Sequence, residues 1–511
     1  MPGKFEKPRN RGQSIQSPET PRPAGNPARP AQRPEGTAPR GQSRPTVPEP
    51  PAPPIRKRRR RRRRPNYLIP LVGAGILLVL VILVLSQCGK FSSSGTQDDS
   101  ASQSTQASTE STAPVVTNTA TISSMGDLLM HAPIFAEKYD ALCYQGDGEY
   151  NFDSLFPYIK PYITQADYAV ANLETTLGGS DFPYQGNPSF NCPDAILDSV
   201  KDSGFDLLLT ANNHCYDTLM VGLKRTVEQI RAKGLESVGT RLSEEEPRYA
   251  IVDVNGIKLG ITCYTYTMVM DAGKPRLNNN DQVEQPALVN YFSTDNLSGF
   301  YSEVSQVCSD MMAQGAEATL FYIHWGTEYE TTENETQRAI AQKLCDLGVD
   351  VIIGGHPHVV QPMDLLTSTA DPEHKTVCIY SLGNAVSNQR IEEMKLKTGH
   401  TEDGVVFSVT FEKCSDGSVR LSDVSVMPTW VNKFVTADWK YEFNILPLDD
   451  ATRDQWKSLY ALTDEQLTNA QNSYTRTMDI LGSGLEKCRN YLTQQTQESQ
   501  IAEPETTQAA A

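Results

Sequence analysis

Large apolar side chains are almost absent from residues 1–66, and acidic residues are scarce there as well. The segment holds 16 of the 33 prolines and 18 Lys or Arg against four Asp or Glu, for a net charge of +14. Without apolar residues a segment cannot bury a core, because nothing offsets the conformational entropy that folding removes. We therefore expect residues 1–66 to form a disordered, extended cytoplasmic tail, and the composition excludes a folded domain there.

Charge is absent from Tyr67–Leu85, nineteen residues dominated by Leu, Val and Ile. A stretch of this length can cross the bilayer as a helix. The basic run Arg56–Arg64 directly before it could, taken alone, be read as a nucleic-acid or nuclear-localisation patch. Beside an apolar stretch, it instead predicts a single-pass anchor in the cell membrane with a cytoplasmic N-terminus and an extracytoplasmic main domain.

Two other interpretations of this region are less favoured. A cleaved signal peptide would need a much shorter segment in front of it. Leu85-Ser86-Gln87-Cys88 resembles a lipoprotein cleavage box, but Gln87 stands where a small residue is expected, so we do not predict lipidation. We expect the Arg-rich tail to contact anionic lipid of the inner leaflet.

Cysteines show no spacing typical of a disulfide scaffold. The chain has ten, of which Cys88 lies at the predicted membrane edge and the others are scattered singly through apolar and helix-like stretches. An extracytoplasmic location permits disulfides. We nevertheless expect mostly buried free thiols, with at most one or two bridges.

Residues 86–119 are rich in Ser, Thr and Gln, the composition of a flexible extracytoplasmic stalk. The whole chain carries a net charge of −16, so residues 67–511 together carry −30. Because an acidic surface repels polyanions, we expect no nucleic-acid partner for the external part.

Strand-like and helix-like segments alternate from Ala120 onward, which indicates an α/β domain over residues 120–447. The apolar, β-branched runs that we expect to be strands are Thr119–Ser124, Tyr168–Ala171, Phe205–Thr210, Lys258–Tyr264, Ala318–His324, Val349–Ile353 and Val377–Tyr380. Segments with helical spacing lie between most of them, at Pro193–Ser203, Met220–Lys233 and Thr332–Leu347.

The C-terminal region carries less chemistry. Gly404–Glu412 and Val419–Met427 flank an Asp-Gly turn and predict a hairpin. We expect helices over residues 448–492, at Asp449–Leu462 and Thr463–Leu492, and a disordered tail over residues 493–511. The Met, Tyr and Trp residues here are expected to pack internally, with a partner surface as the alternative.

Polar motifs follow six of the apolar runs, and five of the seven histidines lie in them. They are Asp127-Leu128-Leu129-Met130-His131, Asn172-Leu173-Glu174, Ala211-Asn212-Asn213-His214 with Asp217, His324-Trp325-Gly326-Thr327-Glu328-Tyr329, Gly354-Gly355-His356-Pro357-His358 and Ser381-Leu382-Gly383-Asn384. In α/β sheets, functional loops lie at the carboxyl ends of strands. Scarce histidines gathered at strand ends predict one shared metal or catalytic site.

Each motif also has a structural interpretation when it is taken singly. Asp127 and Asn213 could cap helices. His324 could be a core histidine, Gly383-Asn384 a turn, and the His356/His358 pair part of a polar loop between strand and helix. The two histidines can converge on one metal only where the backbone bends, which Gly354 and Gly355 allow and Pro357 fixes. Glu174 is harder to explain structurally, because an unpaired buried carboxylate is costly. Six independent coincidences at strand ends favour a common site.

In this order, the motifs resemble the CapA family of poly-γ-glutamate capsule synthesis proteins, over about residues 120–384. That family is related to calcineurin-like metallophosphoesterases, so the resemblance implies a four-layer αββα sandwich that holds divalent metal ions, two of them by analogy, at strand ends. His, Asn and carboxylate ligands suit Mn, Fe and Zn alike. Family members are membrane-anchored bacterial proteins, which agrees with the predicted anchor.

The resemblance implies a role for each motif residue. The metal ligands would be Asp127, joined by His131 or His358, then Glu174 as the bridging carboxylate, and Asn213, His324 and His356. The catalytic pair would be His214, which stabilises the leaving oxygen, and Asp217, which orients it. Residues that support the ligands or contact substrate would be Asn172, Glu328, Tyr329 and Asn384.

Two departures from the phosphoesterase pattern affect the metal ligands. Three residues separate Asp127 from His131 where one is usual, and Asn-Leu-Glu replaces a Gly-Asp-x-x-Asp motif. Two functions therefore stay open. One is a metal-dependent hydrolase or transferase acting on an anionic capsule or cell-wall polymer such as poly-γ-glutamate. The other is a non-catalytic accessory subunit that works with other capsule synthesis proteins and keeps the metal for binding or structure.

Overall fold

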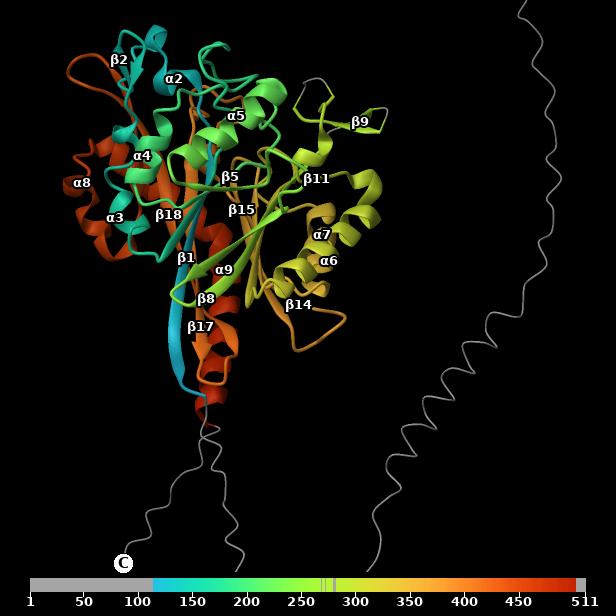
Figure 1. Cartoon of the computed structure of the whole chain (residues 1–511). Coiled ribbons are helices and arrows are strands. Elements are labelled where there is room, and N and C mark those ends of the chain that lie inside the picture. Colours follow the sequence, from blue (N-terminus) through green and yellow to red (C-terminus); the bar gives the residue numbers. More distant parts are fainter. Residues whose placement is uncertain (1–113, 268, 272, 279–281, 502–511) are drawn as a thin grey trace, which may run out of the picture. The chain divides into compact units, whose positions relative to one another are not determined.

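Two mixed β-sheets lie face to face, and helices cover the outer face of each (Figure 1). This computed structural model describes residues 114–501, apart from 268, 272 and 279–281. They all belong to one compact unit, Ala107–Ala511. The predicted tail and membrane anchor lie outside the described residues. Among the residues that are described, no helix is long and apolar enough to span a bilayer.

The first sheet has the strand order β19-β18-β17-β1-β4-β5-β6, and β16 pairs with β1. Strands β1, β4, β5 and β6 run parallel, whereas β17, β18 and β19 are antiparallel. Its strands are β1 (Val116–Leu128), β4 (Tyr168–Asn172), β5 (Leu207–Leu209), β6 (Glu236–Val238), β16 (Asn384–Val386), β17 (Asp403–Cys414), β18 (Val419–Val435) and β19 (Tyr441–Pro447).

The second sheet has the order β11-β8-β12-β13-β15-β14, and β7 pairs with β8. Strands β11, β8, β12, β13 and β15 are parallel, and β7 and β14 are antiparallel. Its strands are β7 (Tyr249–Val254), β8 (Ile257–Tyr266), β11 (Tyr291–Phe292), β12 (Ala318–His324), β13 (Val351–Gly355), β14 (Val360–Thr367) and β15 (Lys375–Leu382). Two small hairpins pair β2 (Tyr144–Gly146) with β3 (Glu149–Tyr150) and β9 (Val269–Asp271) with β10 (Lys274–Arg276).

Helices pack on the sheets through apolar stripes. On α5 (Leu219–Ala232), Met220, Leu223, Val227 and Ile230 recur at helical spacing and are buried. The other α-helices are α2 (Ala132–Phe135), α3 (Lys160–Ile163), α4 (Ile196–Asp202), α6 (Leu297–Ala313), α7 (Glu335–Asp346), α8 (Trp456–Leu459) and α9 (Asp464–Ile501). Short 3₁₀ turns lie at Glu137–Tyr139, Asp153–Leu155, Pro286–Leu288, Thr294–Asn296, His400–Glu402 and Asp450–Gln455.

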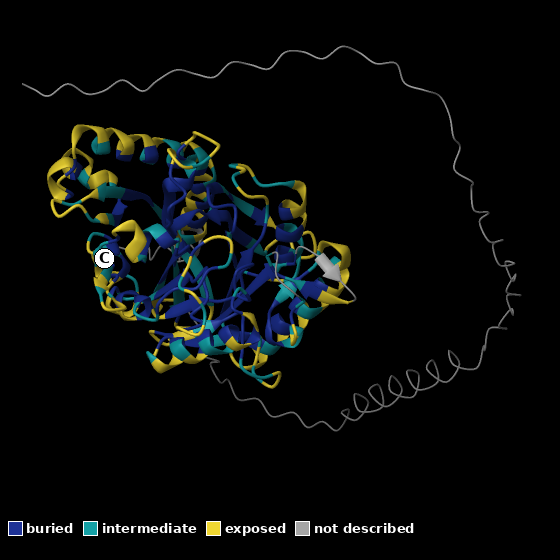
Figure 2. Cartoon of the chain, turned by 90° about the horizontal axis from the view of Figure 1, so that it is seen from above, coloured by how far each residue is buried: buried dark blue, intermediate teal, exposed yellow. Residues whose placement is uncertain are grey.

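Figure 2 shows buried strands at the centre of the domain. The main core lies between the sheets, where strands of both contribute side chains such as Ile122, Leu209, Leu259 and Ile353. A second core lies between the first sheet and α4, and a third between the second sheet and α6 and α7. The layers therefore run helix, sheet, sheet, helix. This arrangement confirms the predicted α/β domain of two sheets covered by helices.

The predicted strands and helices are all present, and β17 and β18 form the predicted hairpin. The nine described cysteines are free and buried, as expected. Asp449–Leu462 is helical as expected, through a 3₁₀ helix at Asp450–Gln455 and the short α8. The expected end of the last helix at Leu492 was wrong, because α9 continues to Ile501, past the predicted start of the tail. Polar Gln, Thr and Glu do not end a helix, and the next proline is Pro504.

Helix α9 closes the gap between the sheets, because its buried Leu481, Leu485 and Cys488 belong to the main core. It approaches β14 closely at Gly484, where an added Cβ would lie 2.1 Å from the backbone oxygen of Met363. At Gly482, one half-turn away, an added Cβ would meet no atom within 4 Å.

These two glycines predict opposite effects. Gly484→Ala should lower the free energy of unfolding by about 1–3 kcal/mol, because the new methyl pushes α9 away from β14. Gly482→Ala should raise it by about 0.5–1 kcal/mol through helix propensity alone. Urea denaturation of both variants measures this. Equal changes would contradict the seating of α9 on β14.

Candidate metal centre

The polar motifs meet where the carboxyl ends of the parallel strands of both sheets come together. Strands β1 and β4 deliver Asp127 and Asn172, β12 ends in His324, and β13 leads into His356. The expected shared edge therefore exists, but two sheets form it. Its buried polar residues are Asp127, Asn172, Glu174, Asn212, Asn213, His324, His356, His358 and Asn384.

Asp127 is fully buried and held by a chain of amides. Its Oδ1 accepts a hydrogen bond of 2.7 Å from Asn172 Nδ2, and Asn172 Oδ1 accepts one of 3.1 Å from Asn212 Nδ2. Its Oδ2 lies 3.4 Å from His358 Nδ1. Burial alone would raise the pKa of Asp127, but His358, His324 and Asn172 together hold that pKa below its ordinary value. The carboxylate is thus kept ionised.

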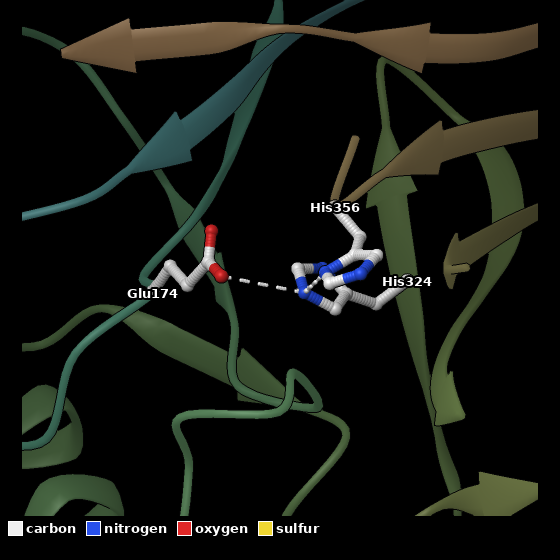
Figure 3. A group of neighbouring side chains, drawn as sticks. All are labelled: Glu174, His324 and His356. Carbon is white, nitrogen blue, oxygen red and sulfur yellow. Dashed lines mark hydrogen bonds and ion pairs between the residues drawn. The ribbon is translucent and has the colours of Figure 1, made fainter. Parts of the chain in front are cut away.

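Glu174 lies fully buried without a hydrogen-bond donor. Among the described residues, neither of its carboxylate oxygens has a hydrogen-bond partner. The nearest ring nitrogen is His324 Nε2, 3.4 Å from Oε1 (Figure 3). His358 Nδ1 lies 3.9 Å from Oε2. Burial, and next the charge of Asp127, raise the pKa of Glu174 well above its ordinary value. An orphaned buried carboxylate of this kind needs a positive charge beside it.

His324 and His356 are buried, and burial favours the neutral form of both rings. His324 Nε2 lies 2.8 Å from Asn213 Oδ1 and 3.2 Å from His356 Nδ1. Burial lowers the pKa of His324 to about 3 and the pKa of His356 well below its ordinary value. Neutral imidazole is the form that binds a metal. The ring of Tyr266 packs 4.7 Å from that of His356 and holds this side of the site.

Three groups of side chains bring their ligand atoms within 4.8 Å of one another in the described part of the chain. They are Glu174, His324 and His356; Asp127, Glu174 and His358; and Glu328, His356 and His358. The donor set of imidazole and carboxylate suits a divalent transition metal. Together with the orphaned oxygens of Glu174, it makes these buried groups compatible with a metal site.

The two histidines of the His-Pro-His motif reach the site through an unusual backbone. His356 has φ 96° and His358 has φ 57°, both in the left-handed region that side chains disfavour. The expected bend is therefore present, and the residues with positive φ are the histidines themselves. Gly354 and Gly355 instead provide room, since added Cβ atoms would lie 1.9 Å from Tyr380 O and 3.1 Å from Asp127 Oδ1. Such local strain is common at functional sites.

His131 lies beside the metal groups and belongs to none of them. Its Nδ1 is 3.2 Å from Leu129 O and 3.3 Å from the backbone nitrogen of Asn388. Its ring stands edge-on to Phe190, with 5.1 Å between the ring centroids. Of the two partners considered for Asp127, the geometry therefore brings His358, and not His131, within reach.

His214 and Asp217 form a second buried pair outside those groups. His214 Nδ1 lies 2.7 Å from Asp217 Oδ2. The same oxygen accepts a 2.6 Å hydrogen bond from the backbone of Phe190, and Oδ1 accepts one of 3.1 Å from Asn278. The carboxylate fixes His214 through Nδ1, so Nε2 is the ring nitrogen left to act on a substrate.

The remaining predicted residues surround His358. Asn384 is buried, its Oδ1 lies 3.2 Å from His358 Nδ1, and its Nδ2 donates to His358 O. Glu328 is exposed, and the Tyr329 ring lies 6.2 Å from that of His358. The motif analysis assigned no role to Asn212 or Tyr266. Asn212 stands inside a motif and Tyr266 ends β8, so the same strand-end rule could have found both.

Comparisons with known proteins agree with the position of the site. The family model described as bacterial capsule synthesis protein PGA_cap matches residues 121–389, a range that includes every residue of the three groups. The PGA biosynthesis protein CapA of Bacillus subtilis (strain 168) is 26% identical over 330 residues, covering 60% of this chain and 78% of the relative. The capsule biosynthesis protein CapA of Bacillus anthracis is 28% identical over 262 residues, covering 50% and 59%.

The raised pKa of Glu174 predicts how Glu174→Gln changes stability. Above the ordinary pKa of 4.5, the unfolded chain releases this proton while the metal-free folded protein keeps it. The contribution of Glu174 to the free energy of unfolding of wild type therefore falls as the pH rises from 4.5 toward the raised pKa of the folded protein. A glutamine does not titrate, so the variant does not lose this stability. In chelator, the melting temperature of the variant minus that of wild type should increase from about pH 5 to pH 8.

Added Mn²⁺ or Zn²⁺ should make wild type the more stable of the two proteins. The metal should raise the melting temperature of wild type and leave that of the Glu174→Gln variant nearly unchanged. Glu393→Gln, at an exposed carboxylate paired with Lys433, is the matched control and should follow wild type in both conditions. Parallel pH curves for Glu174→Gln and wild type, with equal metal responses, would contradict a ligand role for Glu174.

Proposed function

This chain belongs to the PGA_cap family of bacterial capsule synthesis proteins, as its motifs predicted, and we propose that it acts in poly-γ-glutamate capsule synthesis as a metal-dependent hydrolase or transferase. The observation that carries the proposal is the carboxylate of Glu174, which follows β4 of the first sheet and lies buried, without a hydrogen-bond donor among the described residues, beside His324 and His358 of the second sheet. A side chain in that position is costly unless it binds a cation.

The residues present fit two divalent ions that share Glu174. Asp127, Glu174 and His358 would hold one ion, and Glu174, His324 and His356 the other, with Asn213 beside His324. Bound ions would acidify a water nucleophile and neutralise charge that develops on the leaving oxygen. The helix, sheet, sheet, helix layers and the strand-end position support the relation to metallophosphoesterases.

This assignment accounts for the long spacing between Asp127 and His131. His358 approaches Asp127 to 3.4 Å from the other sheet, so a histidine close behind Asp127 in sequence is not needed as a ligand. Glu174 is the second residue after β4, and it takes the place of the carboxylate that the Gly-Asp-x-x-Asp motif of metallophosphoesterases would supply. Asn172, Asn212 and Asn384 then fix the ligands Asp127 and His358 in place.

His214 is the residue we assign to proton transfer. Asp217 holds its Nδ1, which leaves Nε2 to carry the proton that the leaving oxygen needs. Phe190 keeps His214 and Asp217 in one orientation. Its ring centroid lies 4.5 Å from that of His214, and its backbone N–H donates to Asp217 Oδ2. The pair needs no metal contact to do this.

A non-catalytic accessory role is the second candidate. The names of the two relatives state a biosynthetic process and no reaction. In that role the metal would hold the two sheets together at the site, and other capsule synthesis proteins would be the partners. Loss of His214 would then leave function intact.

We also propose that the chain is anchored in the cell membrane through residues 67–85, with its folded domain outside the cytoplasm. The first described strand is β1, Val116–Leu128, and the candidate metal ligand Asp127 lies near its carboxyl end. From Val116 to Asp127 the strand spans roughly 40 Å at the usual rise per residue. The site would therefore face away from the anchored end.

Elemental analysis and activity assays on the full-length chain test the catalytic proposal. Protein purified without chelator should contain about two metal ions per chain and turn over poly-γ-glutamate or a generic phosphodiester. His214→Ala should keep the metal and lose at least about 100-fold in kcat, the usual contribution of a general acid. Metal without turnover would favour the accessory role, and absence of metal would overturn the site.

A further inference from the structure

A polar side chain outside every sequence motif, Asn278, approaches the His214–Asp217 pair. It is the second residue after β10, in the excursion of the chain between β8 and β11 of the second sheet. Its Nδ2 lies 2.7 Å from Pro188 O, 3.1 Å from Asp217 Oδ1 and 3.2 Å from His214 Nδ1. The pair itself follows β5 of the first sheet, so this amide joins loops that leave different sheets.

The turn that carries Asn278 is packed on the motif that it contacts. The preceding residue, Leu277, is fully buried in an apolar cluster with Cys215 and Tyr216, which lie between the two members of the pair in sequence. The backbone nitrogen of Glu284 donates to the hydroxyl of Tyr216 at 3.3 Å. Apolar packing therefore holds Asn278 at this position independently of its own hydrogen bonds.

The neighbours of Asn278 decide how its amide is oriented. Pro188 O and the ionised carboxylate of Asp217 can only accept, so the side-chain nitrogen of Asn278, and not its oxygen, must face them. His214 Nδ1 and Asp217 Oδ2 are 2.7 Å apart, and an unprotonated nitrogen would repel a carboxylate at that distance. Nδ1 therefore carries a proton, and we assign the two amide hydrogens of Asn278 to Pro188 O and Asp217 Oδ1.

With this donor in place, both oxygens of the fully buried Asp217 side chain are engaged. Oδ2 accepts from His214 Nδ1 and, at 2.6 Å, from the backbone of Phe190, while Oδ1 accepts from Asn278. Rotation of the carboxylate plane would break hydrogen bonds on both sides. The plane of Asp217, and with it the ring of His214, is therefore held in one orientation.

We propose that Asn278 is a positioning residue for proton transfer. Its amide fixes the carboxylate of Asp217, which keeps the proton of His214 on Nδ1 and leaves Nε2 to face the leaving group. This inference rests on the proposed function and extends the pair to His214, Asp217 and Asn278, of which His214 alone contacts substrate. It also makes the orientation of His214 depend on the turn after β10.

The proton between His214 and Asp217 tests the proposal without relying on turnover. A ring N–H that is held by a buried carboxylate exchanges slowly with water and gives a downfield ¹H NMR signal, which its loss in His214→Gln would identify. The full-length wild type should show this signal. Asn278→Gly, which tolerates the φ of 52°, and Asn278→Asp, which keeps the shape but cannot donate when ionised, should both broaden it beyond detection.

Kinetics distinguish the positioning of a proton donor from general damage to the site. Two phosphodiesters would be compared, one whose alkoxide leaving group needs a proton and one whose p-nitrophenolate leaving group does not. Asn278→Gly should lower kcat about tenfold or more for the first diester and leave it nearly unchanged for the second, with KM unchanged for both. Equal losses of kcat for both diesters would contradict the positioning role.

Asn255→Gly is the matched control. Asn255 has nearly the same backbone conformation, with φ 53°, and its Nδ2 also donates to a backbone oxygen, that of Thr119 at 3.1 Å. It lies in the turn between β7 and β8, at the opposite end of β8 from Tyr266. This variant should keep the downfield signal and the kcat of wild type.

The outcomes separate this inference from the proposed function. A missing signal in wild type, or one that persists in both Asn278 variants, would overturn the positioning role in an active enzyme as well. Loss in Asn278→Gly with retention in Asn278→Asp would show that Asn278 only shields the pair from water, which also overturns it. A signal that depends on Asn278 in a protein without turnover would retain the positioning of His214 and remove the hydrolase. Melting curves would confirm folding, and if Asn278→Gly is unfolded, Asn278→Asp carries the comparison.

Discussion

The buried carboxylate of Glu174 is the constraint on which the site depends. Glu174 follows β4 of the first sheet, and its two oxygens lie beside His324 and His358 of the second sheet. No described residue donates a hydrogen bond to either oxygen. An uncompensated group of this kind destabilises the fold by an amount comparable to a lost hydrogen bond or more. Burial of the Glu174 carboxylate where the two sheets meet is therefore unfavourable in the protein alone, and a bound cation would make it favourable.

The surroundings of Glu174 are arranged so that the ligands cannot relax away from this position. Asn172 and Asn212 hold Asp127 within the first sheet, and Asn384 of β16 ties the ring of His358 to that same sheet. The positive φ angles of His356 and His358 persist because Gly354 and Gly355 let the strand lie against Tyr380 and Asp127. Rigidity of this kind is what a preorganised metal site requires.

Much of the fold and of the candidate site could be predicted from the sequence, because buried parallel strands appear in it as continuous apolar runs. The strands, the hairpin after Asp403 and the polar residues at strand ends follow from local patterns. The partner of Asp127 could not be chosen, since His358 reaches it from the other sheet and sequence spacing carries no such information. The close approach of the backbone at Gly354 and Gly355 could not be predicted either, because it depends on residues distant in the sequence, such as Tyr380.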